Sequence, residues 1–231
     1  MKLLVLGADA RELSGILARM REVRRMRATA EWVRSGTLGG TAVVLVANGA
    51  GPARAAATVD RAAAEFRPDA IVCTGFCGAL EGSLAVASLV TASRVTGVNG
   101  RFDAQPLAAS LPSRCGAMVT IDHVAQTAAE KRGLRKSGAI AVDMEAAAVA
   151  ERAMALDIPF HCVKAVTDLA GEDMANDLNA ALRPDGHFDT MRILGSISGR
   201  PLARAAELLR LRKRSARAAC ALGDFFADCS F

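Results

Sequence analysis

The sequence predicts an α/β fold in three layers, with a mixed, mostly parallel central sheet flanked by helices. Short, unbroken apolar runs alternate along the chain with segments of helical periodicity. Such runs are typical of strands that are covered on both faces of a sheet. No Pro/Ser-rich or low-complexity linker divides the 231 residues. We therefore expect a single domain over residues 1–231, which includes a basic helical C-terminal segment at about 188–227.

The expected strands are apolar runs that end at glycine or at a polar residue. They cover residues 2–7, 30–36, 41–49, 70–75, 84–95, 116–121, 138–142 and 160–168. Gly39 and Gly40 supply a tight turn between the second and third strands. The expected helices run from the polar residues after Gly7 to about residue 24, and over 51–66, 124–132, 144–156 and 188–227. Pro52 suits the first turn of its helix, and residues 75–78 and 169–187 are expected to be loops.

Composition excludes several classes of protein. Hydrophobic residues make up 52% of the chain, which is enough for a sizeable core, but aromatic residues make up only 4% and tyrosine is absent. The six cysteines and three histidines are scattered, so we expect reduced thiols, no disulfide framework and no metal site. No secretory signal and no apolar run of the ~18–20 residues that span a bilayer is evident. A cytoplasmic protein is expected.

The net charge of +5 is concentrated near the C-terminus, where residues 200–217 contain seven Lys or Arg against Glu207 alone. A helical wheel places one set of small or apolar residues on a single side, beside an arc of arginines. The set comprises Leu202, Ala205, Ala206, Leu209, Ala216 and Cys220. A basic amphipathic helix can bind the surface of an anionic membrane, although an ordinary helix that closes the domain is the alternative. Aromatic residues are too sparse for nucleic-acid binding.

Acidic residues follow several of the expected strands. Glu12 follows the first strand, Asp143 and Glu145 follow the strand at 138–142, and Asp168 ends the strand at 160–168. Because the carboxyl ends of parallel strands meet at one edge of a sheet, we expect these acids to converge. The alternative is that acids simply favour loops and the first turns of helices.

Several carboxylates in one pocket, without a metal or a serine or cysteine triad, suit the cleavage of a glycosidic bond. One acid protonates the leaving group while another orients a water molecule. A further carboxylate can hold two sugar hydroxyls and stabilise the positive charge that grows on the ring.

The sequence also resembles a known family. The motifs "MKLLVLGADARE", "NGAGPARAA", "CTGFCGAL", "AVDMEAAAVA" and "VKAVTDLAGED" are similar, in order and spacing, to those of the purine nucleoside phosphorylase/uridine phosphorylase family. The likeness covers roughly residues 1–180 and is greatest to the methylthioadenosine/S-adenosylhomocysteine nucleosidases. It implies the nucleoside phosphorylase type of sheet, no cofactor, and a homo-oligomer that acts on a small nucleoside.

The resemblance implies a role for each motif residue. Glu12 would position or deprotonate the attacking water, and Asp168 would protonate the purine N7 or hydrogen-bond to it. Glu145 would bind the ribose hydroxyls, and Met144 would pack on the sugar. The glycine loop Gly75–Gly78 would lie beside the base and the sugar. Asp143 would be mainly structural.

The sequence departs from the family at several positions. Cys73 and Phe76 stand where phosphorylases have an arginine and a Ser/Thr that bind phosphate, so hydrolysis is favoured. Phosphorolysis, with phosphate as co-substrate, stays as an alternative, and Arg11 or Arg54 could then be anion ligands. Val124 stands where the nucleosidases stack a phenylalanine on the base.

Three further expectations follow from these departures. Base stacking is either weaker or supplied by Phe76 or Phe160, and His123 is either a loop residue or a ligand contact. An inactive nucleoside- or lipid-binding module is a further alternative.

The C-terminal third resembles hopanoid-associated phosphorylase-like proteins, which are thought to release adenine from adenosylhopane. This likeness implies a lipid-linked substrate and a peripheral position at the inner membrane surface.

Overall fold

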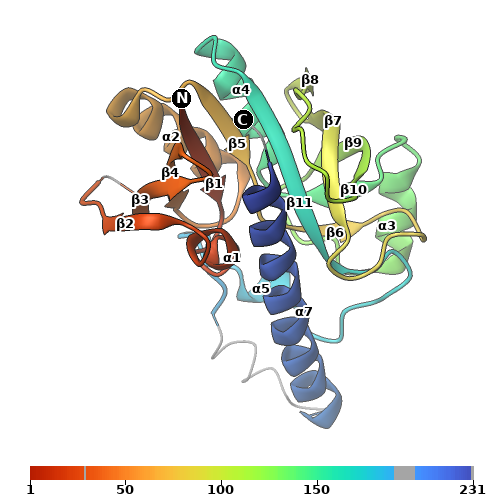
Figure 1. Ribbon diagram of the computed structural model, residues 1–231. Helices are drawn as coiled ribbons and strands as arrows, with labels where there is room; N and C mark the ends of the chain where they lie inside the picture. The colour runs from red at the N-terminus through yellow and green to blue at the C-terminus, as the bar shows by residue number, and fades with distance from the viewer. Residues whose placement is uncertain (29, 190–200, 230–231) are drawn as a thin grey trace.

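The computed structural model describes residues 1–28, 30–189 and 201–229, with the side chains of 201–203 excepted. In this part of the chain, eleven strands form one mixed sheet in the order β2-β3-β4-β1-β5-β11-β6-β10-β9-β7-β8, which confirms the predicted α/β fold (Figure 1). The strands are β1 Lys2–Gly7, β2 Arg21–Arg25, β3 Trp32–Leu38, β4 Thr41–Ala47, β5 Ala70–Cys73, β6 Phe76–Ala79, β7 Leu89–Gly97, β8 Gly100–Asp103, β9 Arg114–Thr120, β10 Ala141–Asp143 and β11 Phe160–Asp168.

Helices cover both faces of the sheet and complete the three layers. They are α1 Ser14–Leu17, α2 Pro52–Phe66, α3 Ala128–Arg135, α4 Ala146–Ala155, α5 Leu178–Ala181 and α7 Pro201–Asp228. The helices α2 and α4 pack on one face in a large apolar cluster, and α1 and α7 pack on the other face in a second cluster. The helix α3 packs through Leu134 in a third, smaller cluster.

The most apolar runs form the predicted strands. Strand β1 pairs in parallel with β4 and β5, and its residues Leu3–Leu6 are buried on both faces. The turn between β3 and β4 uses Gly39 and Gly40 as predicted, both with positive φ. The bounds of β11 coincide with the predicted strand over residues 160–168.

Three predictions about local structure are wrong, and one strand was not predicted. Residues 178–181, within the segment expected to be a loop, form the short helix α5. Residues 21–25 form an exposed strand that pairs with β3 rather than the end of a helix, because "REVRR" has no apolar face for a helix to bury. The glycine segment at 75–78 mostly belongs to β6 rather than to a loop. Strand β8 was not predicted, since only Phe102 within it is buried.

Strand β11 connects the two halves of the sheet. Its residues Phe160–Cys162 pair with β5, and Ala165–Asp168 pair with β6. The register shifts between Val166 and Asp168, and such a bulge re-aims the side chains at a strand end. Strand β10 runs antiparallel to β6, whereas β11 runs parallel to it. The segments that follow β10 and β11 therefore approach β6 from opposite directions.

The C-terminal helix α7 is part of the core. Ala218, Leu222, Phe225 and Phe226 are buried against the sheet. The N-terminal turns of the helix project beyond the sheet (Figure 1). The residues predicted to form its apolar side are instead exposed wherever the structure describes them, at Ala205, Ala206, Leu209, Ala216 and Cys220. Leu202 and residues 190–200 of the predicted helical segment lie outside the described side chains and residues.

Close contact between α1 and α7 depends on glycine. A Cβ atom at Gly15 would lie 1.8 Å from the carbonyl oxygen of Ala219. We expect Gly15→Ala to destabilise the fold by about 1–3 kcal/mol, because one of the two helices must move away. Gly133→Ala in α3 is the control, since nothing lies within 4 Å of its Cβ position. Urea unfolding compares the variants, and equal stability of the two would contradict this account of how α7 packs.

Candidate active site

Glu12 lies in the loop after β1 with its carboxylate buried. The carboxylate accepts hydrogen bonds from the backbone N–H of Ala8 at 2.7 Å and of Phe76 at 3.2 Å. It packs directly on Gly75, where a Cβ atom would lie 2.4 Å from Glu12 Oε2. Gly75 also has a φ of +119°, so both the backbone conformation and the space require glycine. The loop after β1 thus meets the start of β6 through one carboxylate.

Lys164, in the middle of β11, is a site residue that the sequence reasoning missed. Its side chain is 1% exposed, and its Nζ lies 2.9 Å from Asp143 Oδ2 and 3.4 Å from Glu145 Oε2. A single lysine inside the otherwise apolar run "FHCVKAV" was the available signal. A buried ammonium is costly unless it is paired, so the position demanded carboxylate partners.

Asp143 has the structural role that was expected for it. One carboxylate oxygen accepts a hydrogen bond from the hydroxyl of Thr120 at 2.6 Å. The other accepts a hydrogen bond from the backbone N–H of Ala146, in the first turn of α4, at 2.9 Å. Glu145 accepts the backbone N–H of Gly51 at 3.0 Å. Together with Lys164, these bonds fix the segment between β10 and α4, in which Met144 is half-buried.

Asp168, at the end of β11, has a partner that the sequence did not predict. Its Oδ2 accepts a hydrogen bond from Lys131 Nζ at 2.6 Å, and its Oδ1 lies 3.1 Å from the hydroxyl of Thr167. The Asp168 side chain is 15% exposed. A Cβ atom at Gly78 would lie 2.8 Å from Asp168 Oδ2. Asp168 therefore packs against the far part of β6, away from Gly75.

The structure places the predicted acids along one short strand. Glu12 and Glu145 gather around Lys164, and Asp168 lies four residues further along β11, a distance of ~13 Å in an extended strand. Cys77 is buried in the middle of β6, and the charges of Glu12, Lys164 and Asp168 all influence the pKa of its thiol. The acids therefore lie along β6 and do not share one parallel edge of the sheet, because β10 runs antiparallel to β6.

Burial controls the protonation of the cluster. It raises the pKa of Glu12 to about 7, although the charge of Lys164 acts in the opposite direction. Burial also raises the pKa of Glu145 against the same opposing charge. Burial alone would lower the pKa of Lys164, but attraction to Asp143, Glu145 and Glu12 raises it well above its usual value. Lys164 therefore stays charged while Glu12 can exchange a proton near neutral pH.

Beside Glu145 there is a hollow with room for about one water molecule. Thr74 also lines it, and its hydroxyl has no hydrogen-bond partner among the described residues.

Two candidate anion ligands already have partners. Arg11 is 78% exposed and pairs with Asp9 at 2.9 Å. Arg54 bonds to Glu31 and to the backbone carbonyl of Asn48. Both guanidinium groups are therefore already paired with other residues of the chain.

The structure also bears on the residues that were considered for stacking on the base or for contacting the ligand. Phe160 begins β11 at the opposite end from Asp168 and is buried in the core, so it is excluded as a base-stacking residue. Phe76 is half-buried and stays a candidate. His123 is held between Asp122 and Glu130 in its loop, and the backbone of Val124 is bonded to Asn179.

Buried carboxylates and a buried lysine beside a strand that has Gly75 before it and Gly78 within it are typical of an acid–base enzyme site. The profile of the phosphorylase superfamily matches residues 2–110 and 103–186. The chain belongs to the phosphorylase superfamily and is an enzyme of its nucleosidase or nucleoside phosphorylase class.

Individual relatives agree with this assignment. The chain is 29% identical over 203 residues to a 5'-methylthioadenosine/S-adenosylhomocysteine nucleosidase of Geobacillus thermodenitrificans, covering 75% of this chain and 86% of the relative. It is 24% identical over 207 residues to the enzyme of the same name from Staphylococcus aureus strain JH9, covering 77% and 91%.

Solved structures share the fold. The nucleosidase from Streptococcus pneumoniae with a transition-state inhibitor superposes with a TM-score of 0.72 at 19% identity, covering 99% of each chain. The S-adenosylhomocysteine nucleosidase from Streptococcus pyogenes gives a TM-score of 0.72 at 20% identity, covering 100% of this chain and 98% of the other.

The raised pKa of Glu12 predicts how stability depends on pH. The folded protein keeps the Glu12 proton up to about pH 7, whereas the unfolded carboxyl releases it near 4.5. The folded state therefore binds more protons between these values, and its stability should fall as pH rises through this window, by about 3 kcal/mol.

Glu12→Gln removes this titration, so its free energy of unfolding should decline less with pH between 4.5 and 7. Urea unfolding across a pH series measures the two slopes. Exposed Glu65→Gln is the control and should keep the wild-type slope. Parallel slopes for Glu12→Gln and the wild type would show that Glu12 titrates normally.

Proposed function

We propose that the protein hydrolyses the N-glycosidic bond of a 5′-modified adenosine and releases adenine. The observation that carries this proposal is the buried Glu12 carboxylate, which packs on Gly75 and has a pKa of about 7. A carboxylate with this pKa can take a proton from water near neutral pH, as a general base requires. The curated relatives named above support adenosine-type nucleosides as the substrate class.

In the proposed reaction, Glu12 removes a proton from a water molecule as the water oxygen bonds to the anomeric carbon. The electron pair of the C–N bond passes to the base, and Asp168 gives a proton to the base at N7. Glu145 accepts the ribose hydroxyls, and its charge stabilises the oxocarbenium-like ring. Lys164 supports this role because its ammonium favours the ionised form of Glu145.

The substrate would occupy the more exposed side of the cluster. The hollow beside Glu145 is large enough for a water molecule and not for a nucleoside. Met144, Phe76 and Asp168 are only half-buried, and they come from the segment between β10 and α4, from β6 and from β11. In the proposed complex, Met144 and Phe76 would contact the sugar and the base, and Gly75 would allow their close approach.

The charge of the site supports hydrolysis over phosphorolysis. Three buried acids, Asp143, Glu145 and Glu12, surround the single ammonium of Lys164. A phosphate ion next to Gly75 would meet excess negative charge, whereas a neutral water would not. Phosphorolysis would instead produce a sugar 1-phosphate, and only when phosphate is present.

Adenine release from methylthioadenosine, S-adenosylhomocysteine and an adenosylhopane extract, followed by chromatography without phosphate, tests the proposal. We expect adenine from at least one of them. Asp168→Asn and Glu12→Gln should each lower kcat by about 10²–10⁴-fold, because each removes a proton-transfer group. Glu65→Gln is the exposed control. No adenine from any substrate, or near-normal rates in both variants, would contradict the proposal.

The finer proposal is that the 5′ substituent is a lipid, with adenosylhopane and hopanoid biosynthesis as the candidate context. The side of α7 that was predicted to be apolar does not pack on the sheet, and Leu209 on it is 60% exposed. Four exposed cations surround it, at Arg210, Arg212, Lys213 and Arg217. This combination favours peripheral contact with an anionic membrane. No helix in the described part of the chain is both long and apolar enough to cross one.

Replacing these four cations with glutamine should weaken binding to phosphatidylglycerol vesicles by about 10²–10³-fold, at ~1 kcal/mol for each charge near the surface. Cosedimentation measures the bound fraction, with phosphatidylcholine vesicles as the uncharged comparison. A matched control replaces four exposed arginines elsewhere, at 61, 67, 101 and 132. Equal losses in the two variants would indicate a general charge effect and rule out docking through α7.

A further inference from the structure

Lys131 is a completely buried cation on an otherwise polar helix. Its side chain is 1% exposed, whereas Arg132 and Lys136 on the same helix and its end are exposed. Its Nζ donates to Asp168 Oδ2 at 2.6 Å and to the carbonyl oxygen of Leu169 at 2.9 Å. Removing an ammonium from water costs several kcal/mol. Among the described residues, its ammonium bonds only to these two groups, which lie at the end of β11 and just after it.

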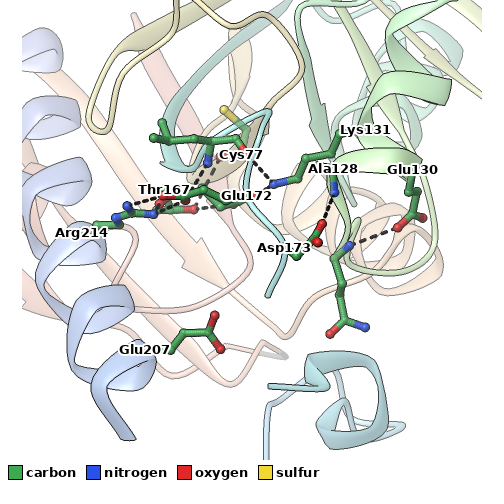
Figure 2. A network of polar contacts seen from close by, with 12 residues as sticks. Cys77, Ala128, Glu130, Lys131, Thr167, Glu172, Asp173, Glu207 and Arg214 are labelled. Atoms are coloured by element: carbon green, nitrogen blue, oxygen red, sulfur yellow. Dashed lines mark hydrogen bonds and ion pairs between the residues drawn. The ribbon is translucent and has the colours of Figure 1, made fainter. Parts of the chain in front are cut away.

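The helix that carries Lys131 is held against the segment that follows Asp168. The backbone N–H of Ala128 donates to Asp173 at 2.7 Å, and that of Met174 donates to the carbonyl oxygen of Gln126 at 2.8 Å. Figure 2 shows Lys131 reaching from α3 toward the region of Thr167 and Cys77, with the Ala128–Asp173 bond beside it. The lysine and the carboxylate are therefore fixed relative to each other by backbone contacts on both sides.

The two oxygens of Asp168 have different surroundings. Oδ2 is bound to Lys131 and lies against Gly78. In the part of the chain that the structure describes, Oδ1 bonds only to the hydroxyl of Thr167. We propose that Lys131 is a positioning residue, which holds Oδ2 of Asp168 against β6 so that Oδ1 meets the leaving base. This inference rests on the proposed function, because it assigns the base to the end of the site where Asp168 lies.

Lys131 also sets the charge at this end of the site. Burial raises the pKa of Asp168, and the ammonium of Lys131 opposes that rise. The other titratable groups nearby are Glu172, Arg214 of α7, to which Glu172 is bonded, and the thiol of Cys77, which burial keeps neutral. Without Lys131 the pKa of Asp168 should rise. Asp168 would then stay protonated up to a higher pH, but its carboxyl group would no longer be held in one orientation.

Lys131→Met and Lys131→Gln test the proposal in the full-length protein, with Lys136→Met at the exposed end of α3 as the matched control. The glutamine variant keeps a hydrogen-bond donor without the charge, so one variant is available if the other fails to fold. Lys131→Arg keeps the charge. Calorimetry measures adenine binding, and steady-state kinetics give kcat and KM as functions of pH.

We expect both uncharged variants to bind adenine about tenfold more weakly and to have lower kcat. Their alkaline limb of kcat should move up by about one pH unit, because Asp168 loses its proton later. Lys131→Arg should restore the wild-type position of that limb. A role in folding alone predicts lower thermal stability with unchanged adenine affinity and pH profile, and that result would overturn the inference.

The two proposals fail differently. If the wild type binds adenine but cleaves no nucleoside, the proposed function fails while the binding series still decides the role of Lys131. If it cleaves nucleosides and the uncharged variants keep the wild-type profile, only the inference about Lys131 fails. A wild type that neither binds adenine nor cleaves any nucleoside overturns both.

Discussion

The arrangement of the site depends on the buried ion pair between Lys164 and Asp143. Lys164 lies in the strand that connects the two halves of the sheet, and Asp143 ends β10 and bonds to the first turn of α4. One contact at 2.9 Å therefore fixes β11, β10 and α4 relative to one another. Removing either partner of such a pair typically costs ~3–5 kcal/mol. Loss of Lys164 would also leave Glu145 and Glu12 without the positive charge that offsets their burial, so the fold and the proposed chemistry share this support.

The sequence predicted the parts of the fold that depend on local patterns. Mainly apolar runs predicted β1, β4, β5 and β11, and Gly39–Gly40 predicted the hairpin, because each signal lies within a few residues. The sequence could not predict that β10 runs antiparallel to β6, since pairing direction depends on chain paths between distant segments. The same applies to α7. Which residues of α7 are buried depends on the surface of α1 and the sheet that the helix packs against, and not on the apolar pattern of the helix itself.

The site was predictable in its acids but not in its lysines. Glu12, Glu145 and Asp168 stand in short motifs at the ends of strands, where position along the chain already suggests a role. Lys131 and Lys164 were missed because a lysine is usually exposed, and only its partners show otherwise. Those partners are 37 residues away for Lys131 and 19 residues away for the bond from Lys164 to Glu145. A charged residue within an apolar strand was a usable signal at Lys164, whereas Lys131 lies in a polar helix without any such contrast.

The motif "TGFCG" has a physical explanation in these contacts. Glu12 packs on Gly75 at the start of β6, and Asp168 packs on Gly78 near its end, so a side chain at either glycine would displace a carboxylate. Each of those regions has its own buried lysine, Lys164 for Glu12 and Lys131 for Asp168. Glu12 and Asp168 are therefore influenced by different ammonium groups. In the proposed reaction Glu12 takes a proton from water and Asp168 gives a proton to the base, and different neighbouring charges allow the two carboxylates to be protonated independently. Under this proposal, the spacing of the two glycines is a constraint of the chemistry as well as of the strand.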